Sequence, residues 1–273
     1  MRTILVPVEQ HDLIDSVLET AFLLAQRFGA YVEGFAARSA FAGLAVGDIG
    51  VPTITEMESV EAILQARRMF EDVMLRRGAS RGESAAGPSF GWRDDAPVGD
   101  AFVGRYGRVF DVVVVGRPDT GRTSPRMSTA EAALFESGRP ILVAPPAPPK
   151  RLGTTVVIAW NGSTETASTV ALAMPLLERA QRVVVLGVKG WGEPPSAEQL
   201  TDSLRRTGIA AETSIAPAQG GTVGEVILAR AASLNCDLLV KGAYTRSRLR
   251  QMILGGATSH VLSRATLPVL MAH

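Results

Sequence analysis

The stretch CDLLVKGAYTRSRLRQMILGGATSHVLSRATLPVLMAH, residues 236–273, decides the fold of this chain. An apolar run ends at Gly242, a polar and basic loop follows, and the pair Gly255–Gly256 precedes another helix-like run. A glycine directly after a buried strand lets backbone N–H groups approach an anion, because no Cβ stands in the way. A glycine pair where a helix begins also favours phosphate, since the helix N-terminus attracts negative charge. Two such points around one cleft indicate a site for a nucleotide phosphate chain, although simple turn glycines would give the same spacing.

The same stretch resembles the C-terminal half of a universal stress protein domain. ATP-binding members of that family carry G-x2-G-x9-G-[S/T] after the fourth strand, and here the pattern falls on Gly242, Thr245, Gly255 and Gly256. Thr245 replaces a glycine that gives the phosphates room, and Gly256 replaces the hydroxyl, which Thr258 could supply instead. The resemblance implies an α/β, Rossmann-like fold of the adenine nucleotide alpha hydrolase type. It also implies ATP or AMP as ligand, with or without Mg²⁺.

Length and composition exclude several classes of protein. With 273 residues, 46% apolar and 20% charged, the chain is typical of one large globular domain or two ordinary ones. No apolar run approaches the roughly 20 residues that span a bilayer, and the N-terminus does not read as a signal peptide, so we expect a cytoplasmic protein without membrane contact. The net charge of +1 argues against nucleic acid as a partner. The single cysteine, Cys236, excludes an intrachain disulfide and is expected at the edge of the core.

Internal repeats determine the predicted architecture. The segments that match in the same order in both halves are residues 4–9 with 156–161, 99–100 with 224–225, 110–117 with 236–243, and 138–146 with 265–273. Four matches in one order indicate a tandem duplication. The proline-rich residues 145–150 are typical of a stiff linker, so the predicted domains are residues 1–147 and 148–273.

Each half reads as five strands that alternate with helices. The expected strands are residues 3–8, 31–36, 89–92, 112–115 and 141–143 in the first half, and 155–160, 182–188, 211–215, 238–241 and 269–271 in the second. Nearly continuous apolar runs of this kind are typical of strands buried on both faces of a parallel sheet. We therefore predict an α/β protein with two tandem open parallel five-stranded sheets flanked by helices. Within the helix expected over 164–179, Pro175 should cause a kink or a break.

Two further features concern association. The last strands of the two halves, 141–143 and 269–271, have exposed edges that could pair with each other within the chain. Residues 38–60 are rich in glycine and small residues and precede a helix predicted over 60–77. This insertion could be a lid over the cleft, a contact in a homodimer or an idle surface segment. The sequence leaves open whether two chains associate.

The candidate site lies in the second half. In open parallel sheets a ligand binds beyond the carboxyl ends of the strands where the strand order reverses, and the loops after the first and fourth strands meet there. In nucleotide-binding universal stress proteins an Asp at the end of the first strand helps to recognise adenine, and Asn161 takes that position. An amide can donate and accept hydrogen bonds, although Asn161 also suits a helix-capping role. The nucleotide-binding candidates are Trp160, Asn161, Gly162, Ser163, Val188, Gly242, Thr245, Arg246, Gly255, Gly256, Ala257 and Thr258.

The first half has different residues at the same positions. The residues that correspond to the end of the first strand and to the phosphate motif are Glu9, Gly116, Asp119, Thr129 and Ala130. Only one glycine of the motif remains, and Asp119 would bring negative charge toward a polyanion. We predict that the first half does not bind ATP in the family manner and serves as a structural partner of the second.

Little in the sequence indicates an enzyme. His11 lies near the first cleft but reads as an exposed loop residue, and His260 falls inside a helix. The sequence has no cysteine and histidine cluster at zinc spacing, no GxSxG elbow and no Walker lysine, so no catalytic or metal-binding residue is assigned. At most, slow ATP hydrolysis is expected. The chain reads as a stress-response protein whose second domain binds an adenine nucleotide as a regulatory ligand; the alternative is an interaction or assembly module that binds none.

Overall fold

The computed structural model describes residues 1–38, 54–84, 86–119, 121, 123–218, 221–243 and 256–273, with side chains left out for 54–59. By its internal contacts the chain divides into Met1–Arg139 and Pro140–His273, which are called the first and the second unit below. The boundary at residues 147 and 148 rests on the composition of the linker and stays a prediction.

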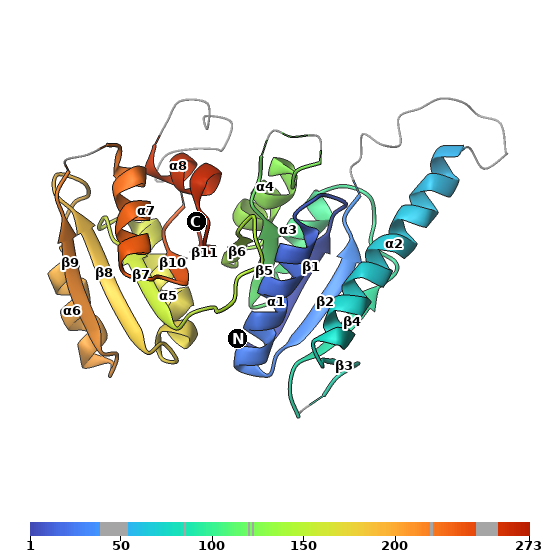
Figure 1. Ribbon diagram of the computed structural model, residues 1–273, viewed down its shortest axis with the longest axis horizontal. Helices are drawn as coiled ribbons and strands as arrows, with labels where there is room; N and C mark the ends of the chain where they lie inside the picture. The colour runs from blue at the N-terminus through green and yellow to red at the C-terminus, as the bar shows by residue number, and fades with distance from the viewer. Residues whose placement is uncertain (39–53, 85, 120, 122, 219–220, 244–255) are drawn as a thin grey trace. The chain divides into compact units, whose positions relative to one another are not determined.

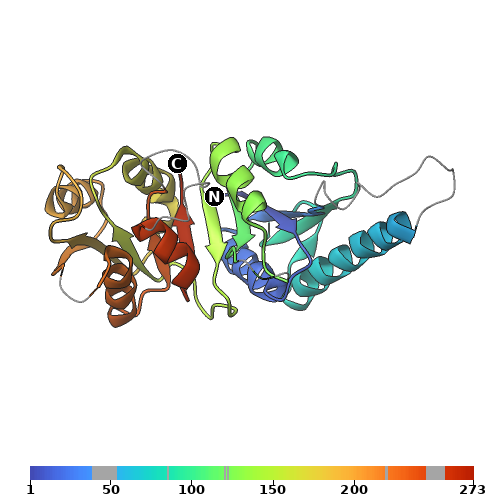
Figure 2. The same ribbon diagram turned by 90° about the horizontal axis from the view of Figure 1, so that it is seen from above.

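The first unit is an open sheet of parallel strands with helices on both faces (Figure 1). In the described residues its strands stand in the order β3-β4-β2-β1-β5. The elements are β1 (Thr3–Val8), α1 (Ile14–Phe28), β2 (Tyr31–Ala36), α2 (Ile54–Arg76), β3 (Ser80–Arg81), β4 (Ser89–Arg93), α3 (Ala101–Gly107), β5 (Val112–Gly116) and α4 (Met127–Glu136). Helices α1 and α2 cover one face, and α3 and α4 cover the other (Figure 2).

The second unit repeats this plan with one additional strand. Its strands stand in the order β6-β11-β10-β7-β8-β9, and β6 alone runs antiparallel to its neighbour β11. The elements are β6 (Ile141–Ala144), β7 (Thr155–Ala159), α5 (Thr164–Leu177), β8 (Arg182–Val188), α6 (Ala197–Arg206), β9 (Ala211–Ala216), α7 (Val223–Ser233), β10 (Leu238–Val240), α8 (Ala257–Arg264) and β11 (Val269–Met271). Helices α5 and α6 lie on one face of the sheet, and α7 and α8 lie on the other (Figure 2).

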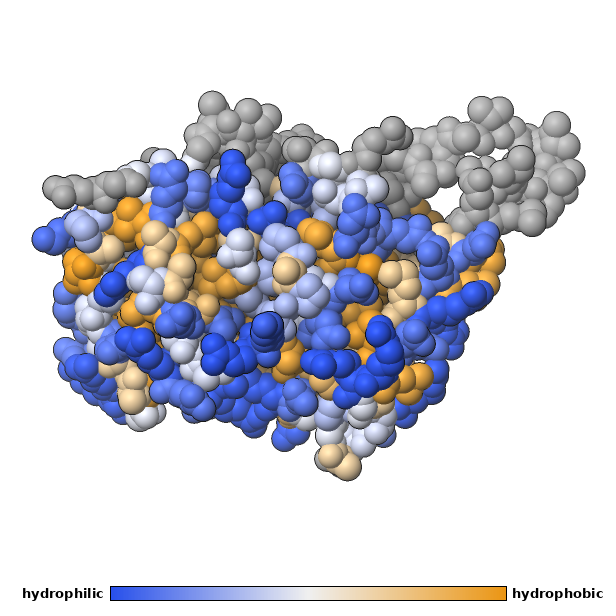
Figure 3. All heavy atoms as spheres, viewed as in Figure 1, coloured by the Kyte–Doolittle hydropathy of each residue, from blue (hydrophilic) through white to orange (hydrophobic). Residues whose placement is uncertain are grey.

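The central strands form the core because both of their faces are covered. Every residue of β5 and β10 is buried, and so are five of the six residues of β1. Burying such apolar side chains contributes about 25 cal/mol per Å² removed from water, which is the main term that favours this layered arrangement. On the outside, hydrophilic side chains are spread over the face in Figure 3, with apolar patches between them. None of the described helices is long and apolar enough to cross a membrane.

Polar residues fix where the helices of the second unit begin. In α6 and α7 the cap side chains of Ser196 and Thr222 accept from the backbone three residues later, and the Gln199 and Glu225 side chains accept from the cap N–H groups in return. Such reciprocal capping satisfies backbone N–H groups that a helix start leaves without partners. The Ser163 side chain caps α5 by accepting from Thr166 N.

The strand predictions are confirmed to within about two residues, and one further short strand is present. The last strand expected in the first half is β6, which pairs with β11, where Val143 lies opposite Val269. This is the pairing that the sequence allowed for the two exposed edges, and it gives β6 hydrogen-bond partners. The short strand β3 was not predicted, because two exposed residues carry no hydrophobic pattern.

Pro175 does not split its helix. It lies in the last turn of α5, which continues to Leu177. A proline removes one backbone hydrogen bond, and near a helix end few turns remain for that loss to disturb. The insertion expected at 38–60 falls mostly outside the described residues; where description resumes, α2 begins at Ile54.

Candidate functional site

In the second unit the strand order reverses between β7 and β10. β10 pairs with β7 on one side and with β11 on the other, whereas β7 leads on to β8 and β9. Ligands of open parallel sheets bind beyond the carboxyl ends of the strands at such a point. The residues that follow β7 and β10 are Trp160 to Ser163 and Lys241 to Ala243, and they include several of the predicted candidates.

A buried lysine joins the end of β10 to the start of α8. Lys241 Nζ donates to the Gly242 carbonyl at 3.0 Å and to Thr258 Oγ1 at 2.6 Å. Lys241 is 4% exposed. Burial lowers the pKa of its ammonium from 10.5 to about 8, because the charged form loses its hydration.

The N-terminus of α8 faces the same place. Its cap residue, Gly256, has φ +146°, a backbone conformation that favours glycine, and no side chain in the described part of the chain caps the helix. The first N–H groups of an α-helix have no partner within the helix, so those of Ala257 and Thr258 are available to an anion. The bond from Lys241 to Thr258 thus brings the start of α8 close to the end of β10 (Figure 1), and the role of Gly242, Gly256, Ala257 and Thr258 in binding stays a prediction.

Gly242 has a second reason to lack a side chain. A Cβ at this position would lie 2.5 Å from both Thr166 N and Thr166 Oγ1, at the start of α5. Contacts that close do not occur in folded proteins, so any side chain here would displace the end of β10 from α5. Gly242 is therefore required for packing whether or not a ligand binds, and its substitution would not test binding cleanly.

Asn161 is held in one orientation by the start of α5. Its Oδ1 accepts from Ser163 N at 3.2 Å and from Thr166 Oγ1 at 2.6 Å. Two donors on Oδ1 fix the side-chain amide so that its NH₂ group points the other way. The capping role considered for Asn161 is real in part, although Ser163 is the N-cap residue itself. No described residue accepts from the Asn161 NH₂ group, so this group can donate to a base.

The loop after β8 covers the end of β7. The Trp160 indole Nε1 donates to the Pro195 carbonyl at 2.6 Å, and Glu193 N donates to the Asn161 carbonyl at 3.0 Å. Gly162 has φ +76°, and a Cβ there would overlap the Glu193 carbonyl. Trp160 and Val188 are both buried. These two residues and Gly162 therefore hold the two loops together, and binding of a base against them stays a prediction.

Three of the predicted residues lie outside the described part of the chain: Thr245, Arg246 and Gly255. Lys241 also lies at the end of β10, and it was not among the residues predicted from the sequence. The repeat carried a signal for it, because the matched strand ends VVVVG and LLVKG differ in placing lysine where the first half has Val115. A lysine at the end of an otherwise apolar, buried strand is unusual and could have been singled out.

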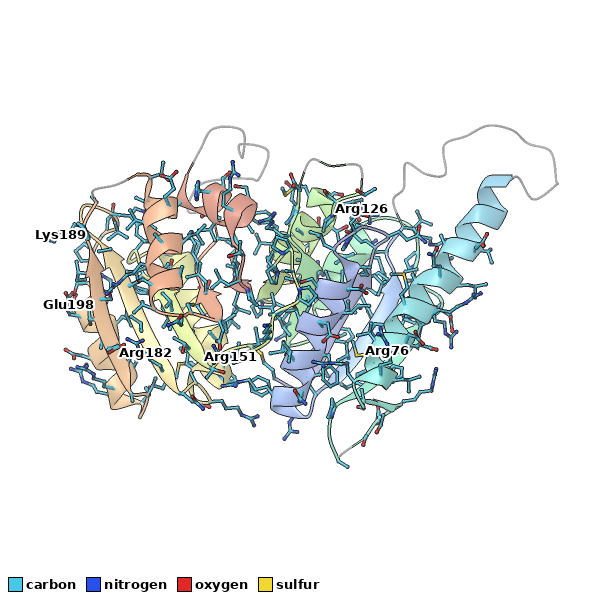
Figure 4. The ribbon with its side chains drawn as sticks, viewed as in Figure 1. Arg76, Arg126, Arg151, Arg182, Lys189 and Glu198 are labelled. Atoms are coloured by element: carbon cyan, nitrogen blue, oxygen red, sulfur yellow. The ribbon has the colours of Figure 1, made fainter. Side chains whose placement is uncertain are left out.

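The matching place in the first unit is filled by the protein itself. Glu9 is 6% exposed, and Arg126 N donates to its Oε2 at 3.0 Å, at the N-cap of α4. The Arg126 guanidinium lies 3.0 Å from Glu9 Oε1 and 2.8 Å from Asp100 Oδ1. Thr129 Oγ1 donates to Glu9 and to Asp100. Arg126 is marked in Figure 4 next to α4.

Burial and neighbouring groups have opposite effects on the pKa values of the two carboxylates in this cluster. Burial raises the pKa of Glu9 above its usual value, although Arg126 and Thr129 act in the opposite direction. For Asp100, burial also acts to raise the pKa, but hydrogen bonds from Ser128 and Arg126 outweigh it and lower the pKa. A carboxylate, a guanidinium and a hydroxyl thus occupy the position where a phosphate would lie.

The expectation that His11 is an exposed loop residue is wrong. His11 is buried, its Nδ1 accepts from Leu13 N at 3.1 Å, and its ring packs close to Gly116. Burial lowers the pKa of His11 to about 4, so the ring is neutral near pH 7. No hydrophobic pattern around His11 in the sequence indicated its burial.

Two other places carry side chains that can be reactive, the thiol of Cys236 and the neighbouring carboxylates of Asp94 and Asp95. Burial raises the pKa of the Cys236 thiol to about 12, which agrees with a core-edge residue and disfavours a reactive thiolate. Asp94 pairs with Arg67 at 2.9 Å and Asp95 with Arg93 at 3.0 Å, beside a shallow hollow lined also by Glu33 and Trp92. The described residues contain no group of three histidine, cysteine or carboxylate side chains that could hold a metal ion.

The model of the universal stress protein family matches residues 154–273, which contain every element from β7 to β11. The second unit is a universal stress protein domain. No curated protein matches the sequence.

The fold of the full chain is also found in solved structures. A universal stress protein from Archaeoglobus fulgidus DSM 4304 is 16% identical with a TM-score of 0.74, and the match covers 99% of this chain and 95% of that one. A functionally unknown protein from Pseudomonas aeruginosa PAO1 is 14% identical with a TM-score of 0.55 and covers 100% and 92%. At these identities the likeness is one of fold. It extends over both units, because both matches span nearly the whole of each chain.

Proposed function

We propose that the universal stress protein domain of this chain binds an adenine nucleotide, ATP or AMP, as a regulatory ligand. The observation that carries the proposal is the meeting of the β10 carboxyl end with the uncapped N-terminus of α8, joined by the bond from Lys241 to Thr258. Free backbone N–H groups at a helix start, a hydroxyl and a cation are the groups that bind phosphate in proteins. The preference for adenine rests on the family resemblance and on the free NH₂ group of Asn161.

The first unit is proposed to be a silent structural partner. Its Glu9 carboxylate lies at the start of α4, so a phosphate there would meet a buried negative charge. Any Mg²⁺ would be held by the phosphates and water, as is common for this ion. Residence in the cytoplasm and association of two chains are part of the same proposal.

Calorimetric titration of the full chain with ATP and with AMP, with and without Mg²⁺ at modest salt, tests the proposal. We expect one nucleotide per chain. Thr258→Val removes the hydroxyl at the start of α8 and should weaken binding about tenfold, the effect of one lost hydrogen bond to a charged group. Ser263→Ala, which alters an exposed hydroxyl at the other end of the same helix, is the matched control.

A second candidate function follows from the loop after β8. Because its contacts with Trp160 and Gly162 occupy the end of β7, the domain could instead be an interaction module without a nucleotide. Absence of binding heat and of thermal stabilisation at millimolar ATP and AMP would favour this reading. Two nucleotides per chain would contradict the silent role of the first unit.

A further inference from the structure

Among the described residues of its own unit, Lys241 forms no ion pair. No ion pair of the described residues includes Lys241, and its two hydrogen-bond acceptors, a carbonyl and a hydroxyl, are neutral. The stretches of the second unit that the structure leaves out, 219–220 and 244–255, contain no Asp or Glu. Buried charges in proteins are normally paired, because an isolated ion is costly to remove from water. These observations call for an anion that the second unit does not itself pair with Lys241.

The start of α8 adds to the positive electrostatic potential at Lys241. Lys241 Nζ contacts Thr258 in the first turn of α8, where the helix dipole places partial positive charge. A cation at this end of a helix is unfavourable unless an anion lies between the two. An ammonium also has three N–H donors, of which two have partners among the described residues.

The two units carry different charges at the point where the end of a central strand meets the start of a helix. In the first unit the carboxylate of Glu9 accepts from the backbone at the start of α4, and the strand position that matches Lys241 is the buried Val115. In the second unit Glu9 is replaced by the neutral Asn161, and Val115 by Lys241. The fold therefore does not need a lysine at the end of this strand. One unit supplies its own anion at the helix start, and the other supplies a cation and no anion.

We propose that Lys241 is the charged anchor of the phosphate subsite, and that the anion binds together with a proton whenever the Lys241 amine is neutral. This inference rests on the proposed function, which it extends by naming the anchoring residue and a regulator, pH. A phosphate oxygen takes the third N–H of the ammonium and lies at the start of α8. Since negative charge stabilises the ammonium form, the bound complex keeps its proton to higher pH than the free protein does.

The free protein has lost about half of the ammonium form at about pH 8, so affinity should fall above this pH. The limit is about tenfold per pH unit for one linked proton. The titratable groups on the elements around Lys241 are Glu165 on α5, His260 and Arg264 on α8, Asp237 at the far end of β10, and His273 with the C-terminal carboxylate just beyond β11. Comparing the wild type with Lys241→Met isolates the contribution of Lys241, because both proteins contain all of these groups.

The experiment is calorimetric titration of the full chain with ATP and with inorganic sulfate, which is fully ionised throughout, from about pH 7.5 to 9.5, in two buffers that differ in ionisation heat. We expect constant affinity up to about pH 8, a fall of up to about tenfold per unit above it, and uptake of a proton at the higher values. Lys241→Met should weaken binding about tenfold or more at pH 7.5 and remove the pH dependence. Lys241→Arg, which stays charged, should restore binding at pH 9.5.

The outcomes separate this inference from the proposed function. If ATP binds equally to the wild type and to Lys241→Met with no change above pH 8, the inference is wrong and the proposed function stands. If sulfate binding depends on Lys241 and on pH while ATP does not bind, the inference stands and the nucleotide function is wrong. If neither anion binds at any pH, both are wrong.

Discussion

The stability of the ligand-free protein should rise between about pH 8 and 10.5, and Lys241→Met should remove this rise. Lys241 loses its proton at about pH 8 in the folded protein, whereas an unfolded lysine keeps it to about 10.5. Between these values the unfolded chain binds more protons, so raising the pH favours the folded state. Below pH 8 both states carry the charge, and the folded state bears the full cost of burying it.

The magnitude follows from the difference between the two pKa values, about 10.5 and about 8. At about 1.4 kcal/mol per pH unit, the full rise is about 3 kcal/mol. About 2 kcal/mol of it should appear between pH 8 and 9.5. No discount for solvent screening is needed, because the side chain is 4% exposed.

Urea unfolding of the wild type and of Lys241→Met at several pH values measures the effect as a difference between the two proteins, which cancels all other titrating groups. Trp160 and Trp191 report on the second unit by fluorescence. The chain has only three lysines, and Lys189→Met changes an exposed one on the same unit, marked in Figure 4, as the control. NMR of isotope-labelled lysine gives the three pKa values directly. A stability difference that stays constant from pH 7.5 to 9.5, or a Lys241 that titrates near 10.5, would refute the reasoning.

Two further predictions concern stability measured by thermal unfolding. Arg126→Met should destabilise the first unit by about 3 kcal/mol, because the Glu9 carboxylate then stays buried without its cation. Adding Glu9→Gln should recover much of this loss. An unchanged loss in the double variant would contradict the prediction. Gly162→Ala should lower the free energy of unfolding by about 3 kcal/mol, since its Cβ would overlap a backbone carbonyl. Gly190→Ala should lower it by about 1 kcal/mol, because Gly190 has φ +73° but nothing within 4 Å of an added Cβ. Equal losses would show that the loop after β8 moves to accommodate the added methyl group.

The fold could be predicted because its signals are repeated and local. Each strand is an apolar run, and similar runs follow in the same order in both halves of the sequence, so that β7 and β10 could be recognised by comparison with β1 and β5. Burial on both faces leaves such runs few alternative arrangements. The pairing of β6 with β11 depends on two distant segments, and the sequence could only allow it.

The site was predicted less completely, because its chemistry depends on contacts between distant residues. Gly242 was expected to make room for a phosphate, but its closest neighbour is Thr166, which lies far from it in sequence. The role of Lys241 appears only when α8 folds back so that Thr258 meets the end of β10. A motif of glycines describes where a backbone can approach a ligand, and it does not identify the charge that attracts the ligand.

The Glu9 carboxylate lies at the start of α4, so the stability of the first unit does not depend on binding a dissolved anion there. Its helix start is neutralised at any metabolite level, because Glu9 is covalently part of the chain and cannot dissociate. For the second unit, the same neutralisation would vary with the concentration of a dissolved anion, and stability gained in this way grows with the logarithm of that concentration. If the second unit binds an anion as proposed, the stability of the first unit is fixed by its own residues, whereas the stability of the second unit depends on the composition of the surrounding solution.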